Sequence, residues 1–136
     1  MKPFLIWLGF IAVVFGVFTV VAVALHETSQ VFVVVDASNR MSAEENRIVR
    51  ELGRIDERDD AEFALATVSD TRNGTGLVHR WQSSLRWEGA ALFGPCSFTA
   101  IDSFAETSEA DERILITTSN SCDTAALIGW EIILLD

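Results

Sequence analysis

The sequence predicts an α/β domain, in which helices flank a mostly parallel sheet, and one transmembrane helix that precedes it. Two continuous apolar runs, at residues 31–35 and 132–135, are typical of strands that are buried on both faces of a parallel sheet. Segments of strand and helix character alternate between them, which favours a layered α/β arrangement. A third apolar run, at residues 4–25, contains no charged residue and is long enough for a helix that crosses a membrane.

The chain of 136 residues divides into four expected segments. These are a cytoplasmic amino terminus (1–3), the transmembrane helix (4–25), a linker (26–30) and one folded domain (31–136). Lys2 precedes the apolar run, and the positive-inside tendency therefore places the domain outside the cytoplasm, in a periplasm or an extracellular space. A cleaved signal peptide is the alternative, although the run is longer than the roughly 7 to 15 apolar residues of such a peptide.

The charge of the domain restricts its partners. The chain holds 20 acidic and 10 basic residues, and of the basic ones only Lys2 precedes the domain. A surface of this charge would repel the phosphate backbone that a nucleic-acid-binding protein must neutralise, so nucleic acid is excluded as a partner.

A helix is expected after the strand at residues 31–35. Ser42 and Glu45 have the spacing of a capping box, which predicts that the helix covers residues 42–55. The apolar residues that recur at helical spacing should face the sheet; they are Met41, Ile48, Val49, Leu52 and Ile55.

Two further strands are expected at residues 62–68 and 77–82. Asn73-Gly74 lies between them and is a strong signal for a tight turn, so these strands should form an antiparallel hairpin. The remaining elements are two helices, a buried strand, a helical turn and the last strand, at residues 85–93, 99–106, 114–116, 123–128 and 132–135.

Ligand sites of such sheets lie beyond the carboxyl ends of the strands, where the strand order reverses. Three polar segments should meet there, at residues 36–41, 96–99 and 117–123. They hold the chain's candidate functional residues.

These segments together resemble the von Willebrand factor A (VWA) family over residues 31–135. An apolar strand runs into Asp36-x-Ser38, Thr99 stands in a loop like the family's threonine loop, and the run that ends in Thr117 is similar to the family's fourth strand. The resemblance implies a VWA-like fold and a metal-ion-dependent adhesion site, in which Asp36, Ser38 and Thr99 would hold Mg²⁺ or Mn²⁺.

The chain departs from the family pattern at two positions of that site. Arg40 replaces a serine of the loop, and Thr118 replaces the aspartate of the turn after the fourth strand. Only one carboxylate, Asp36, remains, whereas a hard cation prefers several oxygen ligands. The resemblance therefore implies a degenerate site, in which Asp36, Arg40, Thr99 and Thr118 contact a partner. Arg40 either pairs with Asp36 or points into solvent.

The resemblance also brings Cys96 and Cys122 to the same end of the sheet. Outside the cytoplasm such a pair is expected to form a disulfide, which would close a loop of about 27 residues. Two free thiols, or a metal site shared with His26 or His79, are the alternatives.

VWA domains usually continue past the fifth strand, whereas this chain stops directly after Leu135. The last strand should therefore be an apolar edge, covered by a partner subunit, the membrane surface or a second copy of the chain. We expect a membrane-anchored, non-catalytic module without a cofactor, acting as an accessory or assembly subunit of a membrane protein complex. A metal-dependent receptor is the alternative. An aspartate-based hydrolase at Asp36 is less favoured, because the chain has no lysine besides Lys2 to pair with a phosphate.

Overall fold

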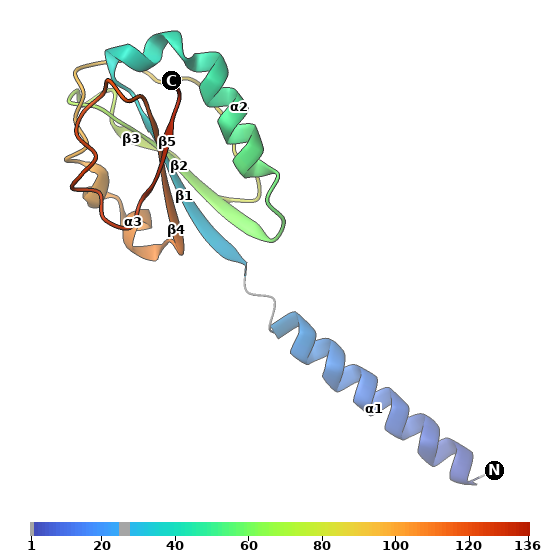
Figure 1. Cartoon of the computed structure of the whole chain (residues 1–136). Helices are drawn as coiled ribbons and strands as arrows, with labels where there is room; N and C mark the ends of the chain where they lie inside the picture. The colour runs from blue at the N-terminus through green and yellow to red at the C-terminus, as the bar shows by residue number, and fades with distance from the viewer. Residues whose placement is uncertain (1, 25–27) are drawn as a thin grey trace.

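The computed structural model describes residues 2–24 and 28–136, and Figure 1 shows an α/β domain with helix α1 (Lys2–Ala24) lying apart from it. The side chains of residues 2–5 and 22–24 are not described. The large apolar side chains from Ile6 to Val21 are mostly exposed, as Phe18 is at 74%. Within the described residues, no helix combines the length and the apolarity that crossing a membrane requires. Leu25, at the expected end of the apolar run, and residues 26–27 of the proposed linker lie outside the described residues.

The domain contains a five-stranded sheet in the order β3-β2-β1-β4-β5. Every neighbouring pair is parallel except β2 and β3, which are antiparallel. The mostly parallel sheet with flanking helices is therefore confirmed. The strands are β1 (Ser29–Asp36), β2 (Ala61–Val68), β3 (Gly76–Gln82), β4 (Glu112–Thr117) and β5 (Glu131–Leu134).

Strand β1 lies at the centre of the sheet, because its apolar run allows burial on every side. Val33 pairs with Leu65 of β2 and with Ile114 of β4, and all three side chains are fully buried. Successive residues of β1 face opposite sides of the sheet. Val33 thus belongs to one hydrophobic cluster, whereas Phe32 belongs to the other.

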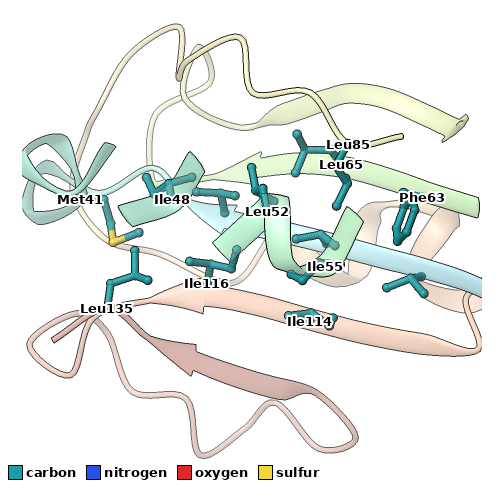
Figure 2. Packing of buried hydrophobic residues seen from close by; sticks show 13 residues of the cluster. Met41, Ile48, Leu52, Ile55, Phe63, Leu65, Leu85, Ile114, Ile116 and Leu135 are labelled. Atoms are coloured by element: carbon teal, nitrogen blue, oxygen red, sulfur yellow. The ribbon is translucent and has the colours of Figure 1, made fainter. Parts of the chain in front are cut away.

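The first cluster packs beneath helix α2 (Glu45–Asp56), which follows a short 3-10 helix at Asn39–Ala43. Figure 2 shows Ile48, Leu52 and Ile55 directed from α2 onto the sheet. These three inward positions are confirmed, and so is Met41, which is completely buried.

Two details of the expected first helix are wrong. Val49 is 51% exposed, because it lies away from the stripe that packs on the sheet. Ser42 does not cap α2: it lies inside the 3-10 helix, and its hydroxyl donates to the Asn39 carbonyl at 2.8 Å. The α-helix therefore begins at Glu45 instead of residue 42.

The second cluster is covered by short elements, which Figure 1 shows on the sheet face opposite α2. A 3-10 helix (Ile101–Ser103) and α3 (Ala105–Glu109) replace the single helix expected over residues 99–106. Phe104 separates them because its backbone is extended, with φ −76° and ψ 132°. Its ring nevertheless packs on Phe32, with centroids 5.8 Å apart.

The helix expected at residues 85–93 is not present, and the helical turn expected at residues 123–128 is replaced by irregular turns. Gly89 has φ +85°, a conformation outside the right-handed helical region, so the helical periodicity of the first segment has no helical backbone beneath it. Leu85 still packs on the first cluster. The second segment forms irregular turns, in which the Leu127 amide donates to the Thr124 carbonyl at 3.0 Å.

The antiparallel hairpin of β2 and β3 is confirmed, but its connection is not a tight turn. Residues 69–75 form a longer loop, and neither Asn73 nor Gly74 has a positive φ. Gly74 is required by close packing: a Cβ there would lie 2.6 Å from the Leu92 carbonyl oxygen. The absence of a side chain at Gly74 therefore allows this loop to pack closely against the segment that precedes Gly94.

An ion-pair cluster joins β3 to α3 at the edge of the domain. Arg80 Nε lies 3.1 Å from Glu106 Oε1, and the Glu106 side chain is only 5% exposed. Arg80 also donates to Glu109 at 2.8 Å, and the indole of Trp81 donates to the same carboxylate at 2.9 Å. These contacts hold the pKa of Glu109 below its usual range, first through the Trp81 hydrogen bond and then through Arg80.

Candidate functional site at the carboxyl edge of the sheet

The carboxyl ends of β1 and β4 meet where the strand order reverses. From β1 the chain passes outward through β2 and β3, then returns to β4 on the other side of β1 and continues to β5. This is the switch point at which open α/β sheets bind ligands. Asp36 ends β1 and Thr117 ends β4, so both residues lie at this point.

Asp36 is completely buried, and four hydrogen-bond donors converge on its carboxylate. The Ser38 amide donates to Oδ1 at 2.8 Å. Three hydroxyl groups donate to Oδ2: those of Ser38 at 3.1 Å, Thr117 at 2.7 Å and Ser121. We call Asp36 and these three residues the carboxyl-edge site. Donors that favour the charged form offset the cost of burying a carboxylate.

Ser38 is positioned by a backbone bridge to the loop before the disulfide. The Asn39 amide donates to the Gly94 carbonyl at 2.8 Å, and the Gly94 amide donates to the Ala37 carbonyl at 3.0 Å. Gly94 also packs closely against Thr71, because a Cβ there would lie 2.6 Å from Thr71 Cγ2. The bridge holds the residues after β1 in place over Asp36.

Ser121 is positioned by its neighbour Cys122, which forms a disulfide with Cys96 across a Cα–Cα distance of 5.7 Å. The Cys122 amide also donates to Cys96 Sγ at 2.9 Å, and the Ser121 amide to the Thr118 carbonyl at 3.1 Å. The expected pairing of the two cysteines is confirmed, and neither is a free thiol. The disulfide thus fixes the loop that carries the third hydroxyl of the site.

Two residues expected at the site do not contact Asp36. Thr99 is exposed, and its hydroxyl lies 3.0 Å from that of Ser97. Arg40 is also exposed, and among residues 2–24 and 28–136 no ion pair joins it to Asp36. Of the two arrangements considered for Arg40, the structure contains the one that points into solvent. Thr118 lies next to the site, and its buried hydroxyl has no hydrogen-bond partner among the described residues.

Two open hollows flank the site, and Arg40 and Asn120 line both of them. The first, of about 390 Å³, lies over the disulfide and is lined by Ser38, Asn39, Arg40, Gly94, Pro95, Cys96, Asn120, Ser121 and Cys122. The second, of about 520 Å³, lies toward α2 and is lined by Arg40, Glu44, Arg47, Thr118, Ser119, Asn120, Leu135 and Asp136.

Asp136 and Arg47 organise the second hollow. The Ser119 amide donates to Asp136 Oδ1 at 3.0 Å, and the hydrogen bonds from Ser119 hold the pKa of Asp136 below its usual range, with a smaller contribution from Arg47. Arg47 donates to the Leu135 carbonyl and lies 3.3 Å from Glu44. The charges of this hollow are therefore largely engaged within the chain.

The residues present do not fit the metal site that the resemblance implies. Mg²⁺ requires near-octahedral oxygen coordination, usually with carboxylates. The carboxyl-edge site has a single carboxylate, whose Oδ2 already accepts three hydroxyl groups, and Thr99 is directed elsewhere. No three histidine, cysteine, aspartate or glutamate side chains of the described part of the chain form a group that could hold a metal ion.

Thr117 and Ser121 are the site residues that sequence reasoning did not single out. Both lie in the expected polar segment at residues 117–123, but Thr118 was preferred there because it aligns with the aspartate of the VWA pattern. The position of Ser121 next to Cys122 was the available signal, since a disulfide at that edge must draw its neighbour toward the end of β1.

The chain matches no protein-family model, no curated protein and no solved structure in the comparisons with known proteins.

Proposed function

We propose that this chain is a membrane-anchored, non-catalytic interaction module of VWA-like type. It acts as an accessory or assembly subunit and binds a protein partner through the rim of the carboxyl-edge site. The position of Asp36, Ser38 and Thr117 at the switch point of the sheet supports the VWA-like part of the proposal.

The bonding of Asp36 is the observation that carries the non-catalytic part. A general base or nucleophile must reach the substrate, but this carboxylate is fully buried and accepts four hydrogen bonds from its own chain. The groups that remain available are the exposed side chains of Asn39, Arg40 and Asn120 around the hollows. Such groups suit recognition of a partner's polar side chains more than bond breaking.

Helix α1 supports the membrane part of the proposal. Its large apolar side chains are exposed, including Phe10 at 65%, Phe15 at 70% and Phe18 at 74%. An apolar helix surface of this kind in water would be an aggregation hazard, whereas lipid or an apolar partner would cover it. The disulfide favours an oxidising compartment for the domain, outside the cytoplasm.

Strand β5 supports the assembly part. It forms one edge of the sheet and pairs only with β4 among the described strands. Leu134 at its end is 51% exposed, and Ile128 in the preceding segment is 88% exposed. An exposed apolar edge is a surface on which a second chain can pair or pack.

Purification of the full chain from its native membrane in mild detergent tests the proposal. We expect a protein partner to co-purify at fixed stoichiometry with the unaltered chain and to be lost with Arg40→Glu, which reverses the charge at the rim of both hollows. Arg50→Glu is the matched control, because Arg50 is an exposed arginine on α2 and does not line either hollow. Retention of the partner by both variants, or its absence from the unaltered chain, would refute the proposed rim.

The metal-dependent alternative is tested separately by thermal unfolding. If the hydroxyl groups around Asp36 are held by the carboxylate and the disulfide, millimolar Mg²⁺ or Mn²⁺ should leave the melting temperature of the full chain unchanged, because a ligand stabilises only the state that binds it. A rise in melting temperature that chelator reverses, and that Asp36→Asn abolishes, would establish the metal-dependent alternative instead.

A further inference from the structure

The disulfide is both the closest covalent constraint on the carboxyl-edge site and open to solvent. Cys96 and Cys122 are partly exposed and line the hollow of about 390 Å³. Thiol–disulfide exchange requires this kind of access, because the attacking thiolate must approach a sulfur atom directly. A disulfide sealed in a core would not meet that requirement.

The same disulfide holds the part of the chain that covers Asp36. Ser121 precedes Cys122, and its hydroxyl both donates to Asp36 Oδ2 and lies 2.9 Å from Cys96 Sγ. The residues after β4 have two other ties here: the Ser119 amide donates to Asp136 Oδ1 at 3.0 Å, and the Ser121 amide donates to Thr118 within the same loop, whereas Asn120 is exposed. The disulfide is therefore the principal link from this loop to the segment around Cys96.

The rest of the Asp36 shell does not depend on the disulfide. Thr117 is fully buried at the end of β4, and Ser38 is held by the backbone bridge between its own segment and Gly94. Both would continue to donate to the carboxylate if the loop at residues 118–122 moved away. Local opening can thus occur without loss of the sheet, since loops open at lower free-energy cost than core strands.

We propose that the Cys96–Cys122 disulfide is a redox latch, whose reduction by a small dithiol releases the loop at residues 118–122 and uncovers Asp36. The thiolate of the dithiol attacks one sulfur, which breaks the S–S bond, forms a mixed disulfide with that cysteine and releases the other cysteine as a thiol. The second thiol of the reductant then attacks the reductant's sulfur in the mixed disulfide and releases the first cysteine. The two cysteines gain two electrons and two protons, while the dithiol closes to a cyclic disulfide. This inference goes beyond the proposed function and does not depend on the identity of a partner.

Carboxyl labelling tests the latch on the full chain in mild detergent. The chain is treated with dithiothreitol or buffer, the thiols are alkylated, and exposed carboxylates are coupled to glycine ethyl ester with a carbodiimide before peptide mass spectrometry. Labelling of Asp36 should rise about tenfold on reduction, as a carboxylate passes from a closed to a locally open state. Glu106 is the internal control: it is also buried, at 4% exposure, but it is held by Arg80 of β3 in the ion-pair cluster at the edge of the domain.

Two variants separate the disulfide from the hydroxyl group. Cys96→Ser with Cys122→Ser should show high labelling of Asp36 without reductant. Ser121→Ala retains the disulfide and should keep Asp36 protected, because the backbone of the loop remains in place.

Each other outcome would overturn the proposal. If both thiols are alkylated while Asp36 stays unlabelled, the disulfide does not control access. If Asp36 and Glu106 become labelled together, reduction unfolds the domain and the bond is only structural. A disulfide that resists dithiothreitol without denaturant would show that the hollow gives no access. High labelling of the oxidised Ser121→Ala variant would assign the protection to the hydroxyl group instead.

Discussion

Asp36 concentrates more hydrogen bonds than any other side chain described at the carboxyl edge, and this makes it the most informative residue to change. Asp36→Asn removes the charge and turns half of the acceptor into an NH₂ donor that faces three hydroxyl donors. We expect the free energy of unfolding to fall by about 2 to 3 kcal/mol, the range for lost hydrogen bonds to a charged group. Denaturant unfolding followed by tryptophan fluorescence measures this change.

Ser38→Ala is the matched control for Asp36→Asn, because it removes one of the four hydrogen bonds and leaves the charge. Its cost should be smaller, about 1 kcal/mol. An Asp36→Asn variant that is as stable as the unaltered chain, or more stable, would contradict this prediction. It would mean that the free-energy cost of burying the charge exceeds the stabilisation from the four hydrogen bonds.

His79 predicts a pH effect that is independent of the site. Burial lowers the pKa of His79 from its ordinary value of 6.5, and nearby Glu88 offsets this only in part. The unfolded chain therefore takes up a proton near pH 6.5 while folded His79 stays neutral. His79 therefore does not lower the free energy of unfolding above this pH, and it lowers that free energy progressively as the pH falls below it.

The prediction for His79 is checked by following the imidazole ring in NMR spectra during a pH titration. The midpoint in the folded chain should lie below the midpoint in urea. Equal titration midpoints in the folded and the urea-unfolded chain would mean that the His79 ring is solvated, and would contradict burial as the cause of its lowered pKa.

Between elements, the Arg80 cluster links an edge strand to the helix on the second face. Arg80→Gln leaves the buried Glu106 carboxylate without its ion-pair partner, which is costlier than the loss of a surface pair. We expect a clear drop in the denaturant midpoint. Arg86→Gln is the control, since Arg86 is exposed and lies in the irregular segment after β3. Equal midpoints for the two variants would show that the cluster contributes nothing.

Apolar patterning was sufficient to predict every strand of the sheet and the inward face of α2, but not the shorter helical segments around them. The runs that became β1 and β4 are apolar because strands covered on both faces must be. The apolar run that became β5 also predicted a strand, although β5 is an edge strand and Leu134 is 51% exposed. The helix expected over residues 85–93 is absent because apolar periodicity indicates which side chains are buried, not which backbone conformation buries them. Leu85 is buried, but the backbone around it is irregular, and Gly89 has a positive φ that a right-handed helix does not allow. Short segments are decided by such tertiary contacts.

The candidate site was predictable only where its residues are close in sequence. Asp36 and Ser38 are two residues apart, and their pairing follows from one strand end. Ser121 reaches Asp36 across 85 positions, through the path of β4 and the disulfide, and a hydroxyl residue in a polar loop carries no pattern of its own. Thr99 was placed by its resemblance to the threonine loop of VWA domains, whereas in the structure its hydroxyl lies 3.0 Å from that of Ser97 and is not among the four donors to Asp36.

For the whole molecule, the proposed anchor makes a direct prediction. The full chain should remain in the membrane pellet after alkaline carbonate extraction, because burial of the exposed apolar side chains of α1 in lipid is strongly favourable. Protease added to the outer face of intact cells or spheroplasts should digest the domain. Release by carbonate would contradict the anchor, and protection from the external protease would contradict its direction.

The parallel sheet also has a mechanical consequence. Helix α1 precedes β1 at its amino end, and the carboxyl-edge site lies at the other end of the same strand, so a partner that pulled on the site against the anchor would load β1 along its axis. The hydrogen bonds to β2 and β4 flank β1 on both sides and would be strained together in shear instead of one after another. The force on β1 would then be shared among all its hydrogen bonds to β2 and β4. Such an arrangement would suit a subunit held between a membrane and a moving partner.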